Sequence, residues 1–193
     1  MATVRTFIAI EMTPLQETLS QIQERLRDGP GGQAGRWVRC EGIHLTLKFL
    51  GEIPEEQLPE VFQAVDRACR GCPPFDLCLA HTGCFPNARS PRVVWVGVEE
   101  KTGQLQALQR AIEDQLASLG FAREKRAFQP HLTLARIHQR ATRSEAQQLG
   151  QATMACDIPA EATMRVERVS VIRSDLKPGG AVYTPLHTTR LSP

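Results

Sequence analysis

The chain has 193 residues, of which 41% are hydrophobic and 23% charged, and its formal net charge is +2. This composition is typical of a globular protein. It excludes a disordered chain and a mini-protein that needs disulfides or metal ions to fold. The small net charge also excludes nucleic-acid binding by bulk electrostatics, while a small acidic substrate is compatible with it. The longest apolar stretch near the start, residues 7–10, is too short for a signal peptide or membrane span. We therefore expect a cytoplasmic protein with no membrane segment.

Hydrophobic periodicity predicts a mixed α and β chain without low-complexity linkers. In chain order, the first half is expected to contain a strand over 3–11, a helix that is capped by Thr13, has Pro14 in its first turn and is ended by residues 28–32, strands over 36–39 and 43–50, a turn over 51–54 and a helix over 55–70. The second half is expected to contain strands over 75–79 and 92–98 that could form a long hairpin, a helix capped by Thr102 and closed by Gly120, a strand from Pro130, a short helix over 144–150 and strands over 165–174 and 182–187.

The cysteines are even in number, but without a secretory signal we expect free thiols. Cys69 and Cys72 have the spacing of half a zinc site, yet no second close pair of Cys or His completes it. We therefore expect no metal. The six residues are Cys40, Cys69, Cys72, Cys78, Cys84 and Cys156.

One tetrapeptide occurs twice, as residues 44–47 and again as residues 131–134, nearly half the chain later. Both copies, His-Leu-Thr-Leu, lie on apolar strand-like runs. Strand geometry sends the His and Thr to one face and the leucines to the other. If the leucine faces are buried and the strands lie side by side, the four polar side chains converge. The alternatives are that these side chains simply face solvent, or that the histidines bind zinc without a recognisable third ligand.

Two imidazoles across a cleft suit metal-free phosphoryl transfer. One can take a proton from the nucleophile while the other delivers a proton to the leaving oxygen, and an ordinary pKa of about 6.5 serves both roles near neutrality. The threonine hydroxyls could donate hydrogen bonds to the non-bridging phosphate oxygens as charge develops. These residues predict a site made of His44, Thr46, His131 and Thr133.

Longer blocks surround the two motifs. They are residues 5–10 (RTFIAI), 37–38 (WV), 44–51 (HLTLKFLG), 85–86 (FP), 91–97 (PRVVWVG), 128–136 (FQPHLTLAR) and, late in the chain, Ser174, Leu176, Gly180 and Tyr183. In this order they resemble the 2H phosphoesterase family, and within it the RNA 2′,3′-cyclic phosphodiesterases, also called 2′-5′ RNA ligases. The segment before the first motif, residues 40–43, departs from the family pattern, as does the glycine-rich stretch 28–35.

The resemblance implies an α+β fold in which two antiparallel sheets flank a central cleft, with helices outside. It implies that residues 1–193 form one domain of two pseudo-symmetric lobes. The implied reaction is hydrolysis of a terminal RNA 2′,3′-cyclic phosphate to a 2′-phosphate, with reversible 2′-5′ joining of RNA ends as a second activity. Neither a metal nor a nucleotide cofactor is expected. RNA ends are the expected partners, tRNA halves among the candidates, and we expect a monomer.

Carried over by motif, the resemblance implies that His44 donates the proton to the departing 3′ oxygen and that His131 accepts the proton of water, although the reverse assignment stays open. Thr46 and Thr133 would hold the phosphate, and Arg136 would neutralise it. By strict alternation Arg136 lies off the His131 face, so a bend or strand end must redirect it.

Further substrate contacts are expected from a lysine and from aromatic side chains. Lys48 shares the His44 face by alternation and could contact the RNA backbone, the alternative being a solvated lysine. Phe7 and Tyr183 are candidates for stacking on a base. Phe49 lies on the leucine face by the same alternation, so we expect it in the core.

Two other functional classes fit the same residues. One is a 2H enzyme with a different substrate: a small cyclic nucleotide, a 2′-5′ oligonucleotide or an ADP-ribose cyclic phosphate. The other is a non-catalytic protein that binds RNA ends.

Overall fold

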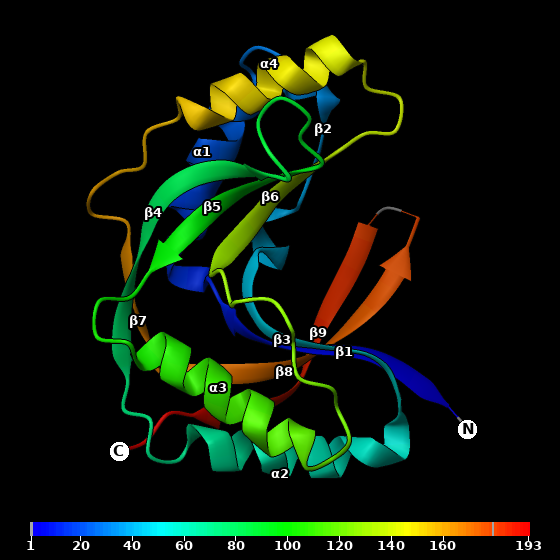
Figure 1. Ribbon diagram of the computed structural model, residues 1–193, viewed down its shortest axis with the longest axis vertical. Helices are drawn as coiled ribbons and strands as arrows, with labels where there is room; N and C mark the ends of the chain where they lie inside the picture. Colours follow the sequence, from blue (N-terminus) through cyan, green and yellow to red (C-terminus); the bar gives the residue numbers. More distant parts are fainter. Residues whose placement is uncertain (1, 179) are drawn as a thin grey trace.

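The computed structural model describes residues 2–178 and 180–193, which form two sheets with helices on their outer sides (Figure 1). The elements in chain order are β1 (Thr3–Glu11), α1 (Gln16–Arg27), β2 (Gly35–Trp37), β3 (His44–Pro54), α2 (Leu58–Cys69), β4 (Phe75–Phe85), β5 (Val93–Glu99), α3 (Gln104–Ala117), β6 (His131–Ile137), α4 (Arg143–Met154), β7 (Thr163–Val166), β8 (Arg168–Lys177) and β9 (Gly180–Arg190).

One sheet has the strand order β3-β1-β8-β9 and the other β2-β6-β5-β4-β7. Neighbouring strands in both sheets are antiparallel. Helices α2 and α3 lie along the first sheet, and α1 and α4 along the second (Figure 1). The expected bilobal α+β fold is therefore confirmed. Each repeated motif lies on a different sheet, and β3 contacts β6 where the two sheets face each other.

Both halves of the chain contribute to both sheets. Strand β2 comes from the first half but pairs with β6, and α3 comes from the second half but packs against α2 and β3. The segment that follows α3 therefore crosses from the first sheet back to β6 of the second (Figure 1).

Each helix has a stripe of residues that faces the core. On α3, Leu105, Leu108, Ile112 and Leu116 are at most 1% exposed. Fully burying such a side chain contributes roughly 1.5–3 kcal/mol. Each stripe thus fixes the face by which its helix packs on a sheet.

Several predicted boundaries are wrong. Residues 51–54 are not a turn: β3 continues to Pro54, and Gly51 has φ 77°, a left-handed value that favours glycine within an irregular strand. Strand β4 extends to Phe85, and α4 runs to Met154. The N-cap of α3 is Gly103, because the Thr102 hydroxyl and N–H donate to Glu100 instead.

All six thiols are free, as expected. In the part of the chain that the structure describes, no helix is long and apolar enough to cross a membrane. Within the same residues, no group of three or more His, Cys, Asp or Glu side chains is placed to hold a metal ion.

Candidate active site

The first motif lies on β3, with its leucines in the core and its polar side chains on the open face. Leu45 and Leu47 are 0% and 3% exposed, whereas His44 and Thr46 are half-buried. On the neighbouring strand, Glu11 is paired with His44 and Ala9 with Thr46. The predicted split between buried leucines and a more open His and Thr is confirmed for all four positions of the motif.

A β-bulge interrupts β3 immediately after Thr46. Thr46 pairs with Ala9 and Lys48 pairs with Ile8, so Leu47 has no partner on β1. One extra residue reverses the alternation that follows it. As a result Lys48 is buried at 8% exposure, and Phe49 is 51% exposed on the open face.

The second motif carries the same bulge. On β6, Thr133 pairs with Trp95 and Ala135 with Val94, which leaves Leu134 without a partner on β5. The reversal brings the exposed Arg136 back to the face of His131 and Thr133. The expectation that a bend redirects Arg136 is confirmed, and Arg136 lines one cavity together with His44 and Thr46.

The two histidines are held by the same type of hydrogen bond. His44 Nδ1 lies 2.8 Å from the Gly42 carbonyl oxygen, and His131 Nδ1 lies 2.7 Å from the Gln129 carbonyl oxygen. A carbonyl only accepts, so each Nδ1–H donates and each neutral ring keeps Nε2 as its acceptor. Both rings therefore have the tautomer in which Nε2 can exchange a proton with a substrate.

Aromatic rings surround His44. Phe7 stacks on it at 4.4 Å between ring centroids, and the edge of Tyr183 meets it at 5.0 Å. Burial lowers the pKa of His44, an effect that the Gly42 carbonyl opposes. His131 has Phe85 edge-on at 5.0 Å. Burial thus favours the neutral form of the His44 imidazole.

Two cavities meet at the polar face of the motifs. The larger, of about 890 Å³, includes His131 in its lining, and the smaller, of about 480 Å³, includes His44, Arg136 and Tyr183. Thr46 and Phe49 line both. The two histidines, which come from different sheets, therefore face adjoining cavities that share one wall.

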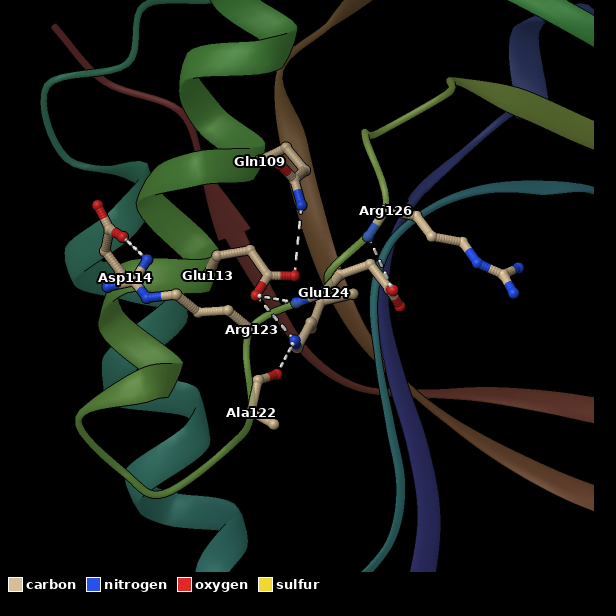
Figure 2. Close-up of polar contacts among 8 residues, drawn as sticks. Gln109, Glu113, Asp114, Ala122, Arg123, Glu124 and Arg126 are labelled. Carbon is tan, nitrogen blue, oxygen red and sulfur yellow. Dashed lines mark hydrogen bonds and ion pairs between the residues drawn. The ribbon is translucent and has the colours of Figure 1, made fainter.

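Lys48 does not share the His44 face, so the predicted alternation is wrong at this position, while its contact with substrate stays a prediction. Its Nζ lies 2.8 Å from Glu113 Oε2 of α3 and donates to the Ala122 carbonyl at 2.6 Å. Glu113 also accepts from the Glu124 N–H and from Gln109, which gathers α3 and the segment after it around one buried ion pair (Figure 2). The bulge at Leu47 is the cause, since it turns Lys48 to the leucine side.

The aromatic candidates have different surroundings. Phe7 is only 3% exposed and stacks on His44, although it belongs to the lining of the smaller cavity, so its stacking on a base stays a prediction. Tyr183 is half-buried and lines the smaller cavity. Phe49, expected in the core, is exposed, and the Arg5 guanidinium lies 4.6 Å from its ring centroid. Nothing in the local sequence pattern signals the bulge that exposes it.

Each of the two motifs lies in a separate match of the chain to the same sequence family. A family model described as LigT like Phosphoesterase matches the chain twice, over residues 10–95 and 96–183, and each match contains one His-x-Thr motif. The chain belongs to the LigT-like phosphoesterases. As a member of this family it is a phosphoesterase built from a sequence repeat, in agreement with the resemblance to 2H enzymes.

Among relatives of this LigT-like phosphoesterase is a protein of Methanothermobacter thermautotrophicus named RNA 2′,3′-cyclic phosphodiesterase. It is 34% identical over 189 residues, which cover 97% of this chain and 99% of that protein. A Thermotoga maritima protein of the same name is 34% identical over 185 residues, which cover 95% of this chain and 94% of that protein.

Solved structures agree with this assignment. TT0787 of Thermus thermophilus has a TM-score of 0.78 at 30% identity and covers 97% of both chains. E. coli LigT complexed with 3′-AMP has a TM-score of 0.76 at 29% identity and covers all of both chains. The LigT-like phosphoesterase fold is thus shared over the whole chain.

Proposed function

We propose that this phosphoesterase hydrolyses the terminal 2′,3′-cyclic phosphate of RNA to a 2′-phosphate by paired-histidine catalysis. The observation that supports it most is the matched anchoring of His44 and His131: each Nδ1 binds the carbonyl two residues earlier, and each ring faces one of two adjoining cavities. The curated relatives named RNA 2′,3′-cyclic phosphodiesterase support the substrate class.

In the proposed reaction, His131 Nε2 accepts a proton from water while the water oxygen forms a bond to phosphorus. The bond from phosphorus to the 3′ oxygen breaks, and His44 donates a proton to that oxygen. The products are a 2′-phosphomonoester and a 3′-hydroxyl. One proton enters through His131 and one leaves through His44, so a transfer through solvent resets both rings.

Thr46, Thr133 and Arg136 hold the phosphate in this proposal. A hydroxyl on each motif donates to a non-bridging oxygen as negative charge develops, and Arg136 adds charge-assisted hydrogen bonds. All three lie on the polar face of the motif strands. Thr133 is given this role because it lies on β6 two residues after His131, where strand geometry puts both side chains on the same face.

The lowered pKa of His44 favours the exchanged assignment, in which His44 accepts the proton of water and His131 donates. A neutral imidazole is ready to act as a base, whereas a donor must first be protonated. The negative charge of a bound cyclic phosphate acts in the opposite direction and stabilises a protonated His44. We keep His44 as the donor and test the choice by pH dependence below.

The same groups account for 2′-5′ joining as a second activity. If the 5′-hydroxyl of another RNA replaces water as nucleophile, attack on the cyclic phosphate forms a 2′-5′ phosphodiester with the same two proton transfers. Joining and its reversal then need no additional catalytic residue.

The direct test is to incubate the EDTA-treated protein with a short RNA that ends in 2′,3′-cyclic phosphate and to identify the product. We expect a 2′-phosphate, and a loss of about 10²- to 10⁴-fold in turnover for His44→Ala and for His131→Ala. Thr46→Ala and Thr133→Ala should lose about 10²- to 10³-fold. His138→Ala, which changes an exposed histidine outside the motifs, is the matched control.

Equal turnover in the wild type and both histidine variants would exclude paired-histidine catalysis. A protein that binds the RNA end but forms no product would be a non-catalytic binder. Parallel assays compare kcat/KM for the RNA with kcat/KM for a small cyclic nucleotide, a 2′-5′ oligonucleotide and ADP-ribose cyclic phosphate. The highest value identifies the preferred substrate.

A further inference from the structure

Four arginines line the smaller cavity beside His44. They come from three strands and one connecting segment, and no Asp or Glu belongs to the described lining of this cavity. Guanidinium groups keep their charge at any physiological pH. The cavity of about 480 Å³ therefore contains a concentrated positive charge in a protein whose formal net charge is only +2. The four residues are Arg5, Arg36, Arg39 and Arg136.

The charges of these four arginines are not balanced by carboxylates of the residues that the structure describes. Among residues 2–178 and 180–193, no carboxylate forms an ion pair with any of the four. Arg36 is also paired directly with Arg136 across the β2 and β6 strands, and like charges in that position are destabilising. An anion bound between them would remove this repulsion.

The larger cavity differs in charge. Its basic residues are interspersed with Glu113, Asp114 and Glu124, and two of them are neutralised by ion pairs, Lys48 with Glu113 and Arg123 with Asp114. Its lining also includes apolar rings such as Phe85 and Phe128. An anionic chain is therefore favoured in the smaller cavity, and a neutral group such as a base or an incoming nucleoside in the larger one.

One phosphate does not account for all four arginines. Under the proposed function, the reacting phosphate lies at the two motifs and takes Arg136, which leaves Arg5, Arg36 and Arg39. Arg5 is held over the exposed ring of Phe49, so its guanidinium is already positioned at the cavity. A terminal mononucleotide offers no further phosphate, whereas an RNA chain offers one at each linkage.

The geometry points to a second phosphate subsite, formed by Arg5, Arg36 and Arg39, that binds the phosphodiester on the 5′ side of the terminal nucleoside. This inference rests on the proposed function and adds to it the part of the molecule that recognises an RNA chain. Phosphate contacts of this kind position the backbone and carry no base specificity, so the subsite selects for chain length and not for sequence.

The test compares two substrates that differ by one linkage: adenosine 2′,3′-cyclic phosphate and the dinucleotide ApA with a 2′,3′-cyclic phosphate. For Arg36→Gln and Arg39→Gln, the ratio of kcat/KM for the dinucleotide to that for the mononucleotide should fall by about 10-fold or more, which corresponds to loss of one charge-assisted hydrogen bond. The slope of log kcat/KM against log salt should become shallower by about 0.7 for the dinucleotide.

Arg168→Gln is the matched control, because Arg168 is also exposed and paired with an arginine, Arg190, across two strands, but lines neither cavity. It should leave the ratio unchanged. If Arg36→Gln and Arg39→Gln lower both substrates equally, or neither, the second subsite does not exist.

A binding measurement separates this inference from the proposed function. Calorimetric titration with the product ligands ApA 2′-phosphate and adenosine 2′-phosphate should show that Arg36→Gln weakens binding of the dinucleotide by about 10-fold more than binding of the mononucleotide. If the wild type hydrolyses neither cyclic substrate but this difference in binding persists, the proposed reaction is wrong and the subsite stands. If hydrolysis is seen without the difference, the subsite is wrong and the reaction stands.

Discussion

At the scale of single residues, two bulges decide what faces the substrate. Leu47 and Leu134 occupy the same place in the two motifs. Each bulge reverses which face of the strand the residues after it point to. The fifth residue after each histidine consequently reaches the open face: Arg136 in the second motif and Phe49 in the first. The two halves differ at this position, and Arg5 above Phe49 supplies the charge that the first half would otherwise lack.

The proton-transfer roles can be separated by pH dependence. If His44 is the donor, kcat/KM falls as pH rises through its pKa, and because burial lowers that pKa the alkaline limb should lie below about pH 6.5 in the free enzyme. His44→Ala should lose this limb and keep the acid limb set by the proton acceptor. Steady-state rates between about pH 5 and pH 9 measure both limbs.

His131→Ala provides the reciprocal experiment, since it should lose the acid limb and keep the alkaline one. An acid limb that disappears in His44→Ala, with an alkaline limb lost in His131→Ala, would exchange the two assignments. His138→Ala should retain both limbs, because this side chain is exposed and outside the motifs.

At the scale of elements, the segment between α3 and β6 is held at both ends. At its start, the Ala122 carbonyl accepts a hydrogen bond from Lys48, and the Glu124 N–H donates one to Glu113 (Figure 2). Near its end, the Gln129 carbonyl accepts from His131 Nδ1. The buried ion pair thus anchors a segment that both lines the larger cavity and orients one of the two motif histidines.

Removing one charge of this pair should be costly. Lys48→Met leaves Glu113 buried without its cation and should lower the free energy of unfolding by about 3–5 kcal/mol. The double variant Lys48→Met with Glu113→Leu removes both charges and should recover most of that loss. Urea unfolding followed by circular dichroism gives the values.

The exposed pair Arg123 and Asp114 offers a control, because Asp114 is the neighbour of Glu113 on α3. Its side chains are 58% and 59% exposed, so Arg123→Gln should cost less than about 1 kcal/mol. A Lys48→Met variant that is equally mild, or a double variant that is no more stable than the single one, would contradict the role given to the buried pair.

At the scale of the whole molecule, the site exists only where the two sheets face each other. His44 and Thr46 belong to the sheet of β1, whereas His131 and Thr133 belong to the sheet of β5. A phosphate held by both motifs would link the sheets and so stabilise the folded protein against unfolding.

Inorganic phosphate should therefore raise Tm. At about 100 times its Kd, mass action adds about 2.7 kcal/mol, or roughly 5–10 °C for a chain of this size. Thr46→Ala and Thr133→Ala should each reduce the shift, because each removes a ligand from a different sheet. Differential scanning calorimetry at constant ionic strength, with chloride in place of phosphate as the control, measures it. A shift that depends on one motif alone would show that phosphate does not link the sheets.

The elements and the motif pair could be predicted from the amino-acid sequence. Strand β1 has the predicted bounds, the stripe on α3 is buried, and the two histidines lie on the polar faces of their strands, because strand and helix periodicity are local properties. The blocks around the motifs were enough to identify the family, which the matches over residues 10–95 and 96–183 confirm.

Which residues complete the site could be learned only from the folded chain. Whether Leu47 forms a bulge depends on its pairing with β1, so alternation alone misplaced both Lys48 and Phe49. Likewise, Arg36 reaches the cavity because β2 pairs with β6, a strand far away in the sequence. Register and strand partners are set by contacts between distant segments, and a local pattern contains no information about them.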